Sequence, residues 1–331
     1  MTSLRARFPG MASGAIAVFA AMAAAAAPPE NLSVAEWAEQ RRVVSDKSGS
    51  PRSGRWQHKT APYLVPVMQW LSPDHPAREI TACAGAQSGK SEIGLNLIGH
   101  TIDVDPAPIL VLLPSTGEAR KYNDVKLQNT IDATPALKAK VAPVRSRSNA
   151  GSTGSRKDYP GGPLMITHAS SSDGLQMISV AVFVLEEVTG YPRSVGGRGS
   201  PREQARARAD AWEDRYKLYQ SSTPGVRGAC VITEDLEAGT HHQVFLPCPH
   251  CGDYSVLQFS NMVAPTPDHP RVTFKCPGCG GLIEPRHKQA MLDACVVVPT
   301  YASGDPDNPS PPVVIPAAEI DRWAARDWAG R

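Results

Sequence analysis

The fold of this chain follows from one stretch, Glu79-Ile-Thr-Ala-Cys-Ala-Gly-Ala-Gln-Ser-Gly-Lys-Ser91. Its first five residues suit a β-strand, its centre is a glycine-rich turn, and a helix is expected from its end to about His100. Strand, loop and helix in this order form the phosphate-binding loop of many nucleotide-binding proteins. The usual first glycine is missing, because position 84 is alanine and Gly85 is displaced by one. The alternative is a plain glycine-rich turn.

Each residue type at the end of this loop suits the binding of a nucleotide. Gly89 lets the backbone approach a phosphate, Lys90 reaches the β- and γ-phosphates, and the Ser91 hydroxyl ligates Mg²⁺. ATP and Mg²⁺ are therefore the expected ligands. The predicted nucleotide-binding residues of the loop are Gly85, Gln87, Ser88, Gly89, Lys90 and Ser91.

A phosphate loop needs an acidic partner, and the run Val180–Leu185 ends in Glu186-Glu187. The run is apolar throughout, which is typical of a buried parallel strand. We expect Glu186 to hold Mg²⁺ and Glu187 to orient the attacking water. Consecutive residues of a strand point to opposite sides, so the two acids cannot do the same task. Lys90, Glu186 and Glu187 are the predicted catalytic group, and the alternative is a pair of solvated acids at a strand end.

Further strands are expected at Pro108–Leu113, Leu164–Thr167 and Leu218–Gln220, with helical stretches between them. Strands that alternate with helices predict an α/β fold, here a P-loop NTPase parallel sheet with an additional strand and helices on both faces. The last strand leads into Ser221–Pro224, whose hydroxyls can sense a γ-phosphate; a Ser/Pro turn is the alternative. Residues 144–162 are polar and glycine-rich, and we expect a long surface loop there.

Four of the seven cysteines form two pairs, Cys248-Pro-His-Cys251 and Cys276-Pro-Gly-Cys279. Each pair places two thiolates on one tight turn, and two such turns complete a tetrahedral site for Zn²⁺. Because protein ligands fill all four positions, the predicted zinc is structural. His250 and His287 are alternative ligands, which the repeated Cys-Pro-x-Cys-Gly pattern disfavours.

The net charge of the chain indicates neither an acidic nor a basic binding partner, because 34 basic residues nearly cancel 32 acidic ones. The apolar run at 11–27 mimics a signal peptide, but it is mostly alanine. We expect an alanine-rich helix or an overlong start there, with a targeting segment as the alternative. We also expect a cytoplasmic protein without a membrane partner.

The expected segments are an N-terminal helical or irregular part (1–57), a P-loop ATPase domain (58–240), a zinc-ribbon module (241–290) and a linker or tail (291–331).

Further blocks of sequence occur in a fixed order along the chain. They accompany the phosphate loop and the two Cys-Pro-x-Cys-Gly turns, which we call the knuckles. They are Ser33-Val-Ala-Glu-Trp-Ala38, Gly54-Arg-Trp56, Ala61-Pro-Tyr63, Pro114-Ser-Thr-Gly-Glu-Ala119, Tyr159-Pro-Gly-Gly162, Tyr191-Pro192 and Ser222-Thr-Pro224. In this order they resemble the large terminase subunit of lambda-like tailed phages, over roughly residues 30–290.

The resemblance implies an ATP-hydrolysing motor that packages double-stranded DNA in a bacterial host cell. It places Tyr63 on the adenine side of the nucleotide. It also implies a small terminase subunit, a portal or procapsid, and a homo-oligomer as partners. Members of the family carry a C-terminal nuclease domain, whereas this chain stops at Arg331 after an expected helix at Ala317–Trp328. We therefore expect no nuclease activity from this chain.

Several positions depart from the family pattern. Glu186 stands where the family has aspartate, Leu64 where it has glutamine, and Ile178 where it has arginine; Gly199-Ser-Pro201 replaces Gly-Asp-Pro. The change at Glu186 and the expected lack of a nuclease domain favour an alternative, a degenerate prophage terminase fragment that binds DNA or capsid partners without turnover. A helicase-like zinc-ribbon ATPase would need helicase motifs after residue 300, and none is visible.

Basic residues on two segments are candidates for contact with DNA phosphates. They are Arg193, Arg198, Arg202, Arg206 and Arg208, together with Arg145, Arg147, Arg156 and Lys157 of the expected loop. Arg208 is our choice for an arginine finger that acts in trans. The alternative is a solvated helix face whose charges are balanced by Glu203, Asp210, Glu213 and Asp214.

Overall fold

The computed structural model describes residues 18, 19, 22, 30–143, 153–175, 179–226, 228–265, 267, 270–302 and 309–326. The chain forms two units, Met1–Leu32 and Ser33–Arg331. Most of the expected N-terminal helix lies outside the described residues, as do Arg145, Arg147 and Ile178. In the part of the chain that is described, no helix has the length and apolar character needed to span a membrane.

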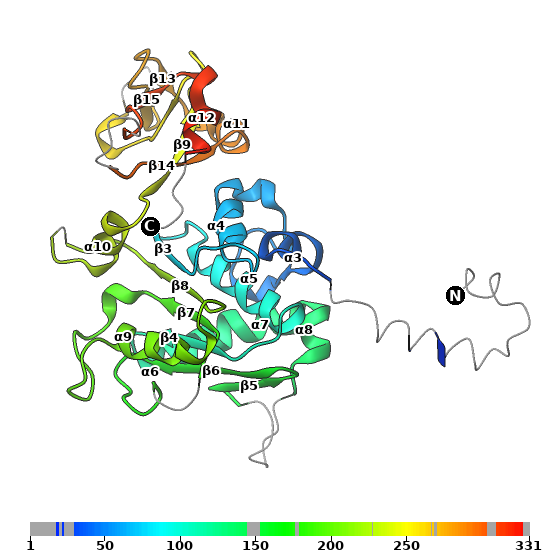
Figure 1. The fold of residues 1–331 in the computed structure, drawn as a ribbon. Coiled ribbons are helices and arrows are strands. Elements are labelled where there is room, and N and C mark those ends of the chain that lie inside the picture. Colours follow the sequence, from blue (N-terminus) through cyan, green and yellow to red (C-terminus); the bar gives the residue numbers. More distant parts are fainter. Residues whose placement is uncertain are drawn as a thin grey trace, which may run out of the picture. The chain divides into compact units, whose positions relative to one another are not determined.

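Six described strands form the largest sheet, which is drawn from cyan to green in Figure 1. They are β3 (Glu79–Cys83), β4 (Ile109–Leu113), β5 (Arg156–Tyr159), β6 (Gly162–His168), β7 (Val182–Glu186) and β8 (Lys217–Ser222). Their spatial order is β3-β8-β7-β4-β6-β5, and only β5 runs antiparallel to its neighbour. The predicted parallel sheet is confirmed, with β8 as the additional strand between the loop strand β3 and the acidic strand β7.

Helices pack on both faces of this sheet, as predicted. On one face Phe183 of β7 packs in a cluster with Ala205 of α9 and Ile232 of α10. On the other face α5 lies close to β7 and β8, since a Cβ added to its Gly94 would meet Val184 at 2.8 Å. Two covered faces explain why β4 and β7 are buried along their whole length.

The helices before and within the sheet domain are α3 (Val34–Arg41), α4 (Val65–Trp70), α5 (Lys90–Asp103), α6 (Thr116–Lys121), α7 (Gln128–Ala133), α8 (Pro135–Lys140), α9 (Pro201–Arg206) and α10 (Val231–Ala238). A π-helical turn, η4 (Tyr122–Leu127), joins α6 to α7. Short helical turns are η1 (Asp46–Ser48), η2 (His58–Thr60), η3 (Pro62–Leu64), η5 (Val188–Gly190), η6 (Ala207–Trp212), η7 (Phe259–Asn261), η8 (Pro285–His287) and η9 (Ala317–Glu319).

The segment around α3, which we call the entry segment, is anchored on α5 by Trp37. Ser33 and Glu36 form a capping box at the start of α3. Trp37 is fully buried, and its indole nitrogen donates to the Asp103 carboxylate at 2.8 Å at the end of α5. After α3 the chain forms a short two-stranded sheet, in which Val43–Val44 (β1) pairs with Gly54–Arg55 (β2).

The surface loop expected at 144–162 is wrong for its second half. Arg156–Tyr159 form β5, an edge strand whose residues alternate between solvent and interior. Lys157 is only 1% exposed and donates to the Gln128 side-chain oxygen at 2.7 Å, so it is removed from the candidate DNA contacts. The β5–β6 turn requires glycine, because Gly161 has φ +104° and an added Cβ would lie 2.3 Å from Pro106 Cβ.

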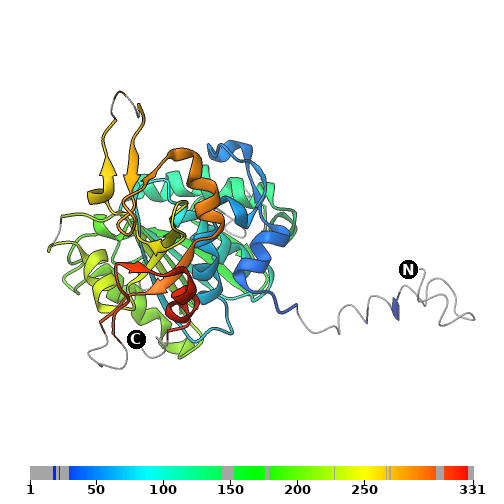
Figure 2. The ribbon, with the colours of Figure 1, turned by 90° about the horizontal axis from the view of Figure 1, so that it is seen from above.

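The region after residue 240 contains two small sheets among its described residues. Strands β9 (His242–Pro247), β10 (Tyr254–Ser255), β14 (Val296–Pro299) and β15 (Val314–Ile315) pair in the order β14-β9-β10-β15, and β11 (Met262–Val263), β12 (Thr273–Lys275) and β13 (Leu282–Ile283) pair in sequence. Figure 2 shows β11 and β12 as a yellow hairpin. The helices of this region are α11 (Lys288–Asp293) and α12 (Ile320–Ala324).

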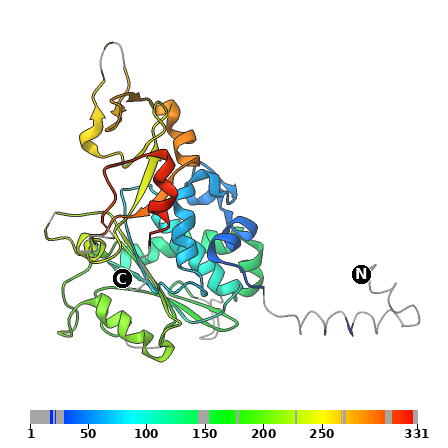
Figure 3. The same ribbon diagram turned by 45° about the horizontal axis from the view of Figure 1, so that its top comes forward.

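The segment expected as a linker or tail, 291–331, contains the strands β14 and β15 as well as the expected helix. Strand β14 pairs along β9, and Val298 packs in one cluster with Phe245, Ile315 and Ile320. Figure 3 shows α12 in red beside the yellow and orange strands of this sheet. The apolar residues of β14, β15 and α12 thus complete a small core with β9. The expected C-terminal helix is present up to Ala324, and residues 327–331 lie outside the described part.

Candidate functional site

The loop between β3 and α5 presents the start of a helix to a ligand. Gly89 caps α5 in a left-handed conformation with φ +85°, which favours glycine. The first N–H groups of an α-helix have no partner within the helix and carry partial positive charge, so they bind anions. Leu64, which stands where the family has glutamine, packs on this turn, because a Cβ on Gly89 would lie 2.8 Å from Leu64 Cδ1.

The other predicted loop residues lie around this turn. The Tyr63 hydroxyl donates to the carbonyl of Ser88 at 3.0 Å, and burial raises the pKa of Tyr63. The Ser88 hydroxyl is buried without a hydrogen-bond partner among the described residues. Gly85 and Gln87 are exposed, and Gln87 has a positive φ of 58°. The Tyr63 side chain therefore supports the loop by a hydrogen bond to the loop's backbone.

Lys90 contacts two segments distant in sequence. Its ammonium lies 3.2 Å from Glu187 Oε1 and donates to the Thr223 hydroxyl at 3.1 Å. Its own carbonyl accepts from the Tyr219 hydroxyl at 2.7 Å. Lys90 is 8% exposed, so its charge is held at the start of α5 by this frame.

Glu186 ends β7 and is buried, with 2% of its surface exposed. Its Oε2 accepts from the hydroxyls of Ser91 at 2.8 Å and Ser221 at 3.2 Å. Burial raises the pKa of Glu186, while the charge of Lys126 and the two hydroxyl donors oppose this shift. Glu186 Oε1 is buried without a hydrogen-bond partner among the described residues. A free carboxylate oxygen beside a serine hydroxyl fits Mg²⁺, which prefers oxygen ligands.

Glu187 has other partners than Glu186, and its backbone does not continue the strand. It leaves the strand in a left-handed conformation with φ +52°. Its Oε2 accepts from the Thr223 N–H at 3.3 Å and from the Ser222 hydroxyl at 3.4 Å. Its side chain remains 43% exposed. One acid is thus buried against Ser91, and the other is open to solvent beside Lys90.

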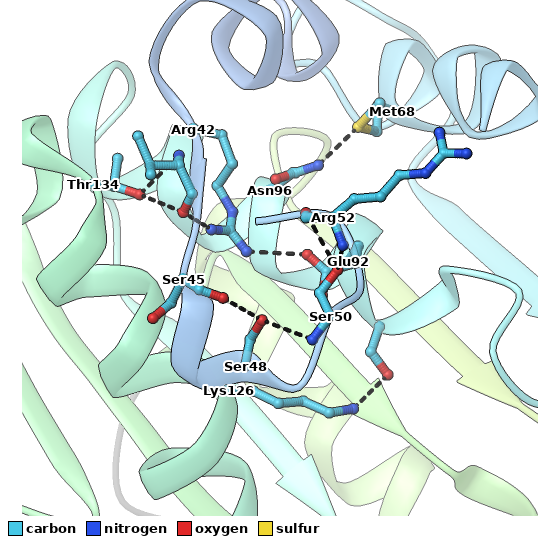
Figure 4. Close-up of polar contacts among 12 residues, drawn as sticks. Arg42, Ser45, Ser48, Ser50, Arg52, Met68, Glu92, Asn96, Lys126 and Thr134 are labelled. Atoms are coloured by element: carbon cyan, nitrogen blue, oxygen red, sulfur yellow. Dashed lines mark hydrogen bonds and ion pairs between the residues drawn. The ribbon is translucent and has the colours of Figure 1, made fainter. Parts of the chain in front are cut away.

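Lys126 is a residue of this cluster that the sequence analysis missed. It comes from the π-helical turn η4, and its ammonium donates to the Ser91 hydroxyl at 2.9 Å, a contact drawn in Figure 4. Its position depends on how η4 is held between α6 and α7, and nothing in the local sequence distinguishes Lys126 from the neighbouring lysines. Figure 4 also shows buried Arg42, which donates to Glu92 at 3.0 Å and ties the entry segment to α5.

The Ser222–Pro224 segment joins the site to the turn after β7. The Thr189 hydroxyl bonds to the Ser222 hydroxyl and donates to the Thr223 carbonyl at 3.1 Å. Thr223 also contacts Lys90 and Glu187. The segment therefore lies where a change in the contacts of Lys90 can reach a neighbouring turn.

The candidate DNA-binding arginines from Arg193 to Arg208 differ in their surroundings. Arg202 pairs with Asp235 and donates to the Gln220 side chain at 3.0 Å, and Arg206 lies 2.7 Å from Glu79. Arg193 and Arg198 are exposed. Arg208 is half-buried, and its Nε has no hydrogen-bond partner among the described residues.

The four paired cysteines form one cluster. The Sγ atoms of Cys248, Cys251, Cys276 and Cys279 all lie within 4.8 Å of one another. Tetrahedral zinc with Zn–S bonds of ~2.3 Å requires S···S distances of ~3.8 Å. The Cys248 and Cys279 sulfurs are 3.8 Å apart, so the donor set fits zinc.

The two knuckles have the same backbone geometry. The Cys248 N–H donates to Asp253 O at 2.8 Å, and the Cys276 N–H donates to Gly281 O at 2.9 Å. Burial opposes ionisation of Cys276, but backbone N–H donors outweigh it and lower its pKa to about 7. His250 is outside the ligand set, because its Nε2 lies 2.8 Å from the Leu282 carbonyl. Cys83, Cys230 and Cys295 lie outside the cluster.

These features define a P-loop NTPase fold with a Cys₄ cluster compatible with a zinc ribbon. The sheet has its glycine-rich loop at the carboxyl end of β3, and a buried acid ends β7 beside the first turn of α5. The family model for the phage terminase large subunit gpA, ATPase domain, matches residues 50–296. The chain belongs to this family.

The chain is similar to the large terminase subunits of two phages. It is 27% identical over 255 residues to that of Escherichia phage lambda and 25% identical over 241 residues to that of Enterobacteria phage P21. These matches cover 74% and 72% of this chain, but the chain spans only 38% and 36% of the two relatives. The crystal structure of the HK97 bacteriophage large terminase matches with a TM-score of 0.47 and 15% identity, over 63% of this chain and 41% of that one.

Proposed function

We propose that this chain binds and hydrolyses ATP as the motor part of a phage large terminase subunit. The observation that carries the proposal is the meeting of Lys90, Ser91, Glu186 and Glu187 at the start of α5. This arrangement places a cation, a hydroxyl and two carboxylates where a triphosphate would meet the helix N-terminus. Family membership supports the same activity.

Each group has a task that its surroundings favour. The N–H groups of α5 and the Lys90 ammonium bind the β- and γ-phosphates, and Tyr63 lies on the adenine side. Ser91 and Glu186 hold Mg²⁺, which neutralises phosphate charge when bound. Glu187 orients and polarises water, because its carboxylate is solvent-accessible and held by the Thr223 N–H.

The site also suggests how hydrolysis reaches the rest of the chain. Lys90 contacts both Glu187 and Thr223, and Thr223 is bonded to Thr189 of the turn after β7. When the γ-phosphate leaves, Lys90 loses one partner and its contact with Thr223 changes. We propose that this movement is coupled to the grip on double-stranded DNA. The further partners we propose are a small terminase subunit, a portal or procapsid and further copies of this chain, in the cytoplasm of a bacterial host.

We also propose that Cys248, Cys251, Cys276 and Cys279 bind one structural Zn²⁺. The support is the size and symmetry of the sulfur cluster. With four protein ligands the zinc keeps no open position for a substrate, so it stabilises the module rather than taking part in catalysis.

Glu187→Gln tests the proposed ATPase. The amide cannot accept a proton from water, so we expect nucleotide affinity to be kept and turnover to fall about 10²–10⁴-fold. Phosphate release and binding of a fluorescent nucleotide are measured with DNA present. Lys90→Ala is the matched variant that should lose binding, because the backbone alone does not neutralise the triphosphate.

Turnover of Glu187→Gln at the parent rate would place the water-activating group elsewhere. A parent protein without turnover, even with DNA and a small subunit, would favour the degenerate fragment.

A further inference from the structure

Lys126 is placed at the two groups that we expect to hold magnesium. Its ammonium donates to the Ser91 hydroxyl at 2.9 Å, and that hydroxyl donates to Glu186 Oε2 at 2.8 Å. Ammonium, hydroxyl and carboxylate therefore form a chain at the first turn of α5. Figure 4 draws the hydrogen bond of the Lys126 ammonium as a dashed line.

The burial of Glu186 gives this contact its importance. A carboxylate removed from water is costly unless a cation or several donors compensate for it. Lys90, the other lysine at the start of α5, lies 3.2 Å from Glu187 Oε1. This leaves Lys126 as the cation on the Ser91 side of Glu186 among the contacts of the described residues.

The backbone that carries Lys126 is unusual. Tyr122–Leu127 form a π-helical turn, and such turns are rare and frequently lie at functional sites. The Lys126 ammonium also lies 5.7 Å from the centre of the Tyr122 ring, which is buried beneath it. A lysine is a compact charge on a flexible four-carbon chain, so it can leave one anionic partner for another without movement of the backbone.

We propose that Lys126 and Mg²⁺ compete for Ser91 and Glu186, with Lys126 as the built-in counter-cation of the site. The proposal rests on nucleotide binding at this site, and it adds a device that sets how strongly that binding depends on magnesium. With magnesium present, the metal takes the two oxygen ligands and displaces the ammonium. Without magnesium, Lys126 screens Glu186 from the phosphates, so the nucleotide still binds.

The test is the affinity of ADP measured in excess EDTA and in saturating Mg²⁺. The ratio of the dissociation constant in EDTA to that in Mg²⁺ reports how much magnesium assists binding. In Lys126→Met the metal-free site has lost its cation, so the EDTA affinity should fall while the affinity with Mg²⁺ stays the same or improves. We expect the ratio to rise about tenfold or more, because a single charge a few ångströms away is only weakly screened in a partly buried site.

Two further variants make the result specific. Lys121→Met removes an exposed lysine of the adjacent helix α6 and should leave the ratio unchanged. Lys126→Gln removes the charge but keeps a polar chain, and it answers the same question if the methionine variant is unstable. A ratio that is unchanged or lower in both Lys126 variants overturns the competition. A parent protein that binds no ADP under either condition refutes the proposed function itself.

Discussion

Gly94 makes room for the longer acid at the end of β7. A Cβ at this position would lie 3.2 Å from Glu186 Oε1 and 2.8 Å from Val184 Cγ1. The family pattern has the shorter aspartate at this strand end, so glutamate needs more space between β7 and α5. The absence of a side chain at position 94 provides part of that space, and it lets the Glu186 carboxylate reach Ser91.

Gly94→Ala should therefore overpack this contact. We expect a loss of about 1–3 kcal/mol in the free energy of unfolding, measured with urea. The matched variant is Gly85→Ala, since a Cβ at Gly85 would meet nothing within 4 Å and its backbone is unstrained. It should change stability by less than about 1 kcal/mol, in the stabilising direction. Equal stability of the two variants would show that Val184 and Glu186 move aside freely.

At the scale of elements, the region after residue 240 consists of short strands held by few apolar residues. The cluster beside the knuckles has four buried members among the described residues, namely Cys248, Cys276, Ile283 and Met291. Two of them are predicted zinc ligands. So small a core stabilises a module only weakly, and a structural metal commonly supplies what is missing.

Metal removal should therefore unfold this module before the large sheet. We expect about one zinc per chain by elemental analysis of protein purified under reducing conditions, as a single Cys₄ site requires. Cys276→Ser should lose the zinc and expose residues 248–283 to proteases, while ADP binding at the P-loop persists. Cys295→Ser is the control, because Cys295 lies outside the cluster and should keep the metal. Fully reduced protein without zinc would contradict the assignment.

At the scale of the whole molecule, charge is distributed so that few of the candidate arginines remain available to DNA. The formal net charge is only +2, and Arg202 and Arg206 are paired with Asp235 and Glu79. Arg193 and Arg198 are exposed on the segment that precedes α9. Among the residues that the structure describes, Arg193 and Arg198 are therefore our strongest candidates for contact with the DNA backbone.

The double variant Arg193→Gln/Arg198→Gln should weaken binding to duplex DNA of any sequence. Each phosphate contact contributes about 0.9 to the slope of log affinity against log salt, so the slope should become shallower by about two. Arg206→Gln is the matched control, because its guanidinium already pairs with Glu79, and it should leave the slope unchanged. The measurement is a salt titration of fluorescence anisotropy. An unaltered slope in the double variant would place the DNA elsewhere.

Much of the fold and part of the site follow from contiguous residues alone. The stretch 79–91 specifies a strand, a tight turn and a helix start, because glycine and small residues at fixed spacing allow little else. The apolar run that forms β7 specifies a strand covered on both faces. The two knuckles specify a four-sulfur cluster, since each is a local turn with its own backbone hydrogen bonds.

Only the tertiary structure decided which distant groups meet. Strand β5 is polar because it lies at a sheet edge, so its sequence carries no apolar signal that distinguishes it from a loop. Lys126 and Ser91 are 35 positions apart, and Lys90 and Thr223 are 133 apart. Such contacts depend on strand order and helix packing, which bring separate segments together at the carboxyl edge of the sheet. Local periodicity records which face of an element is buried, but it does not record which partner that face will meet.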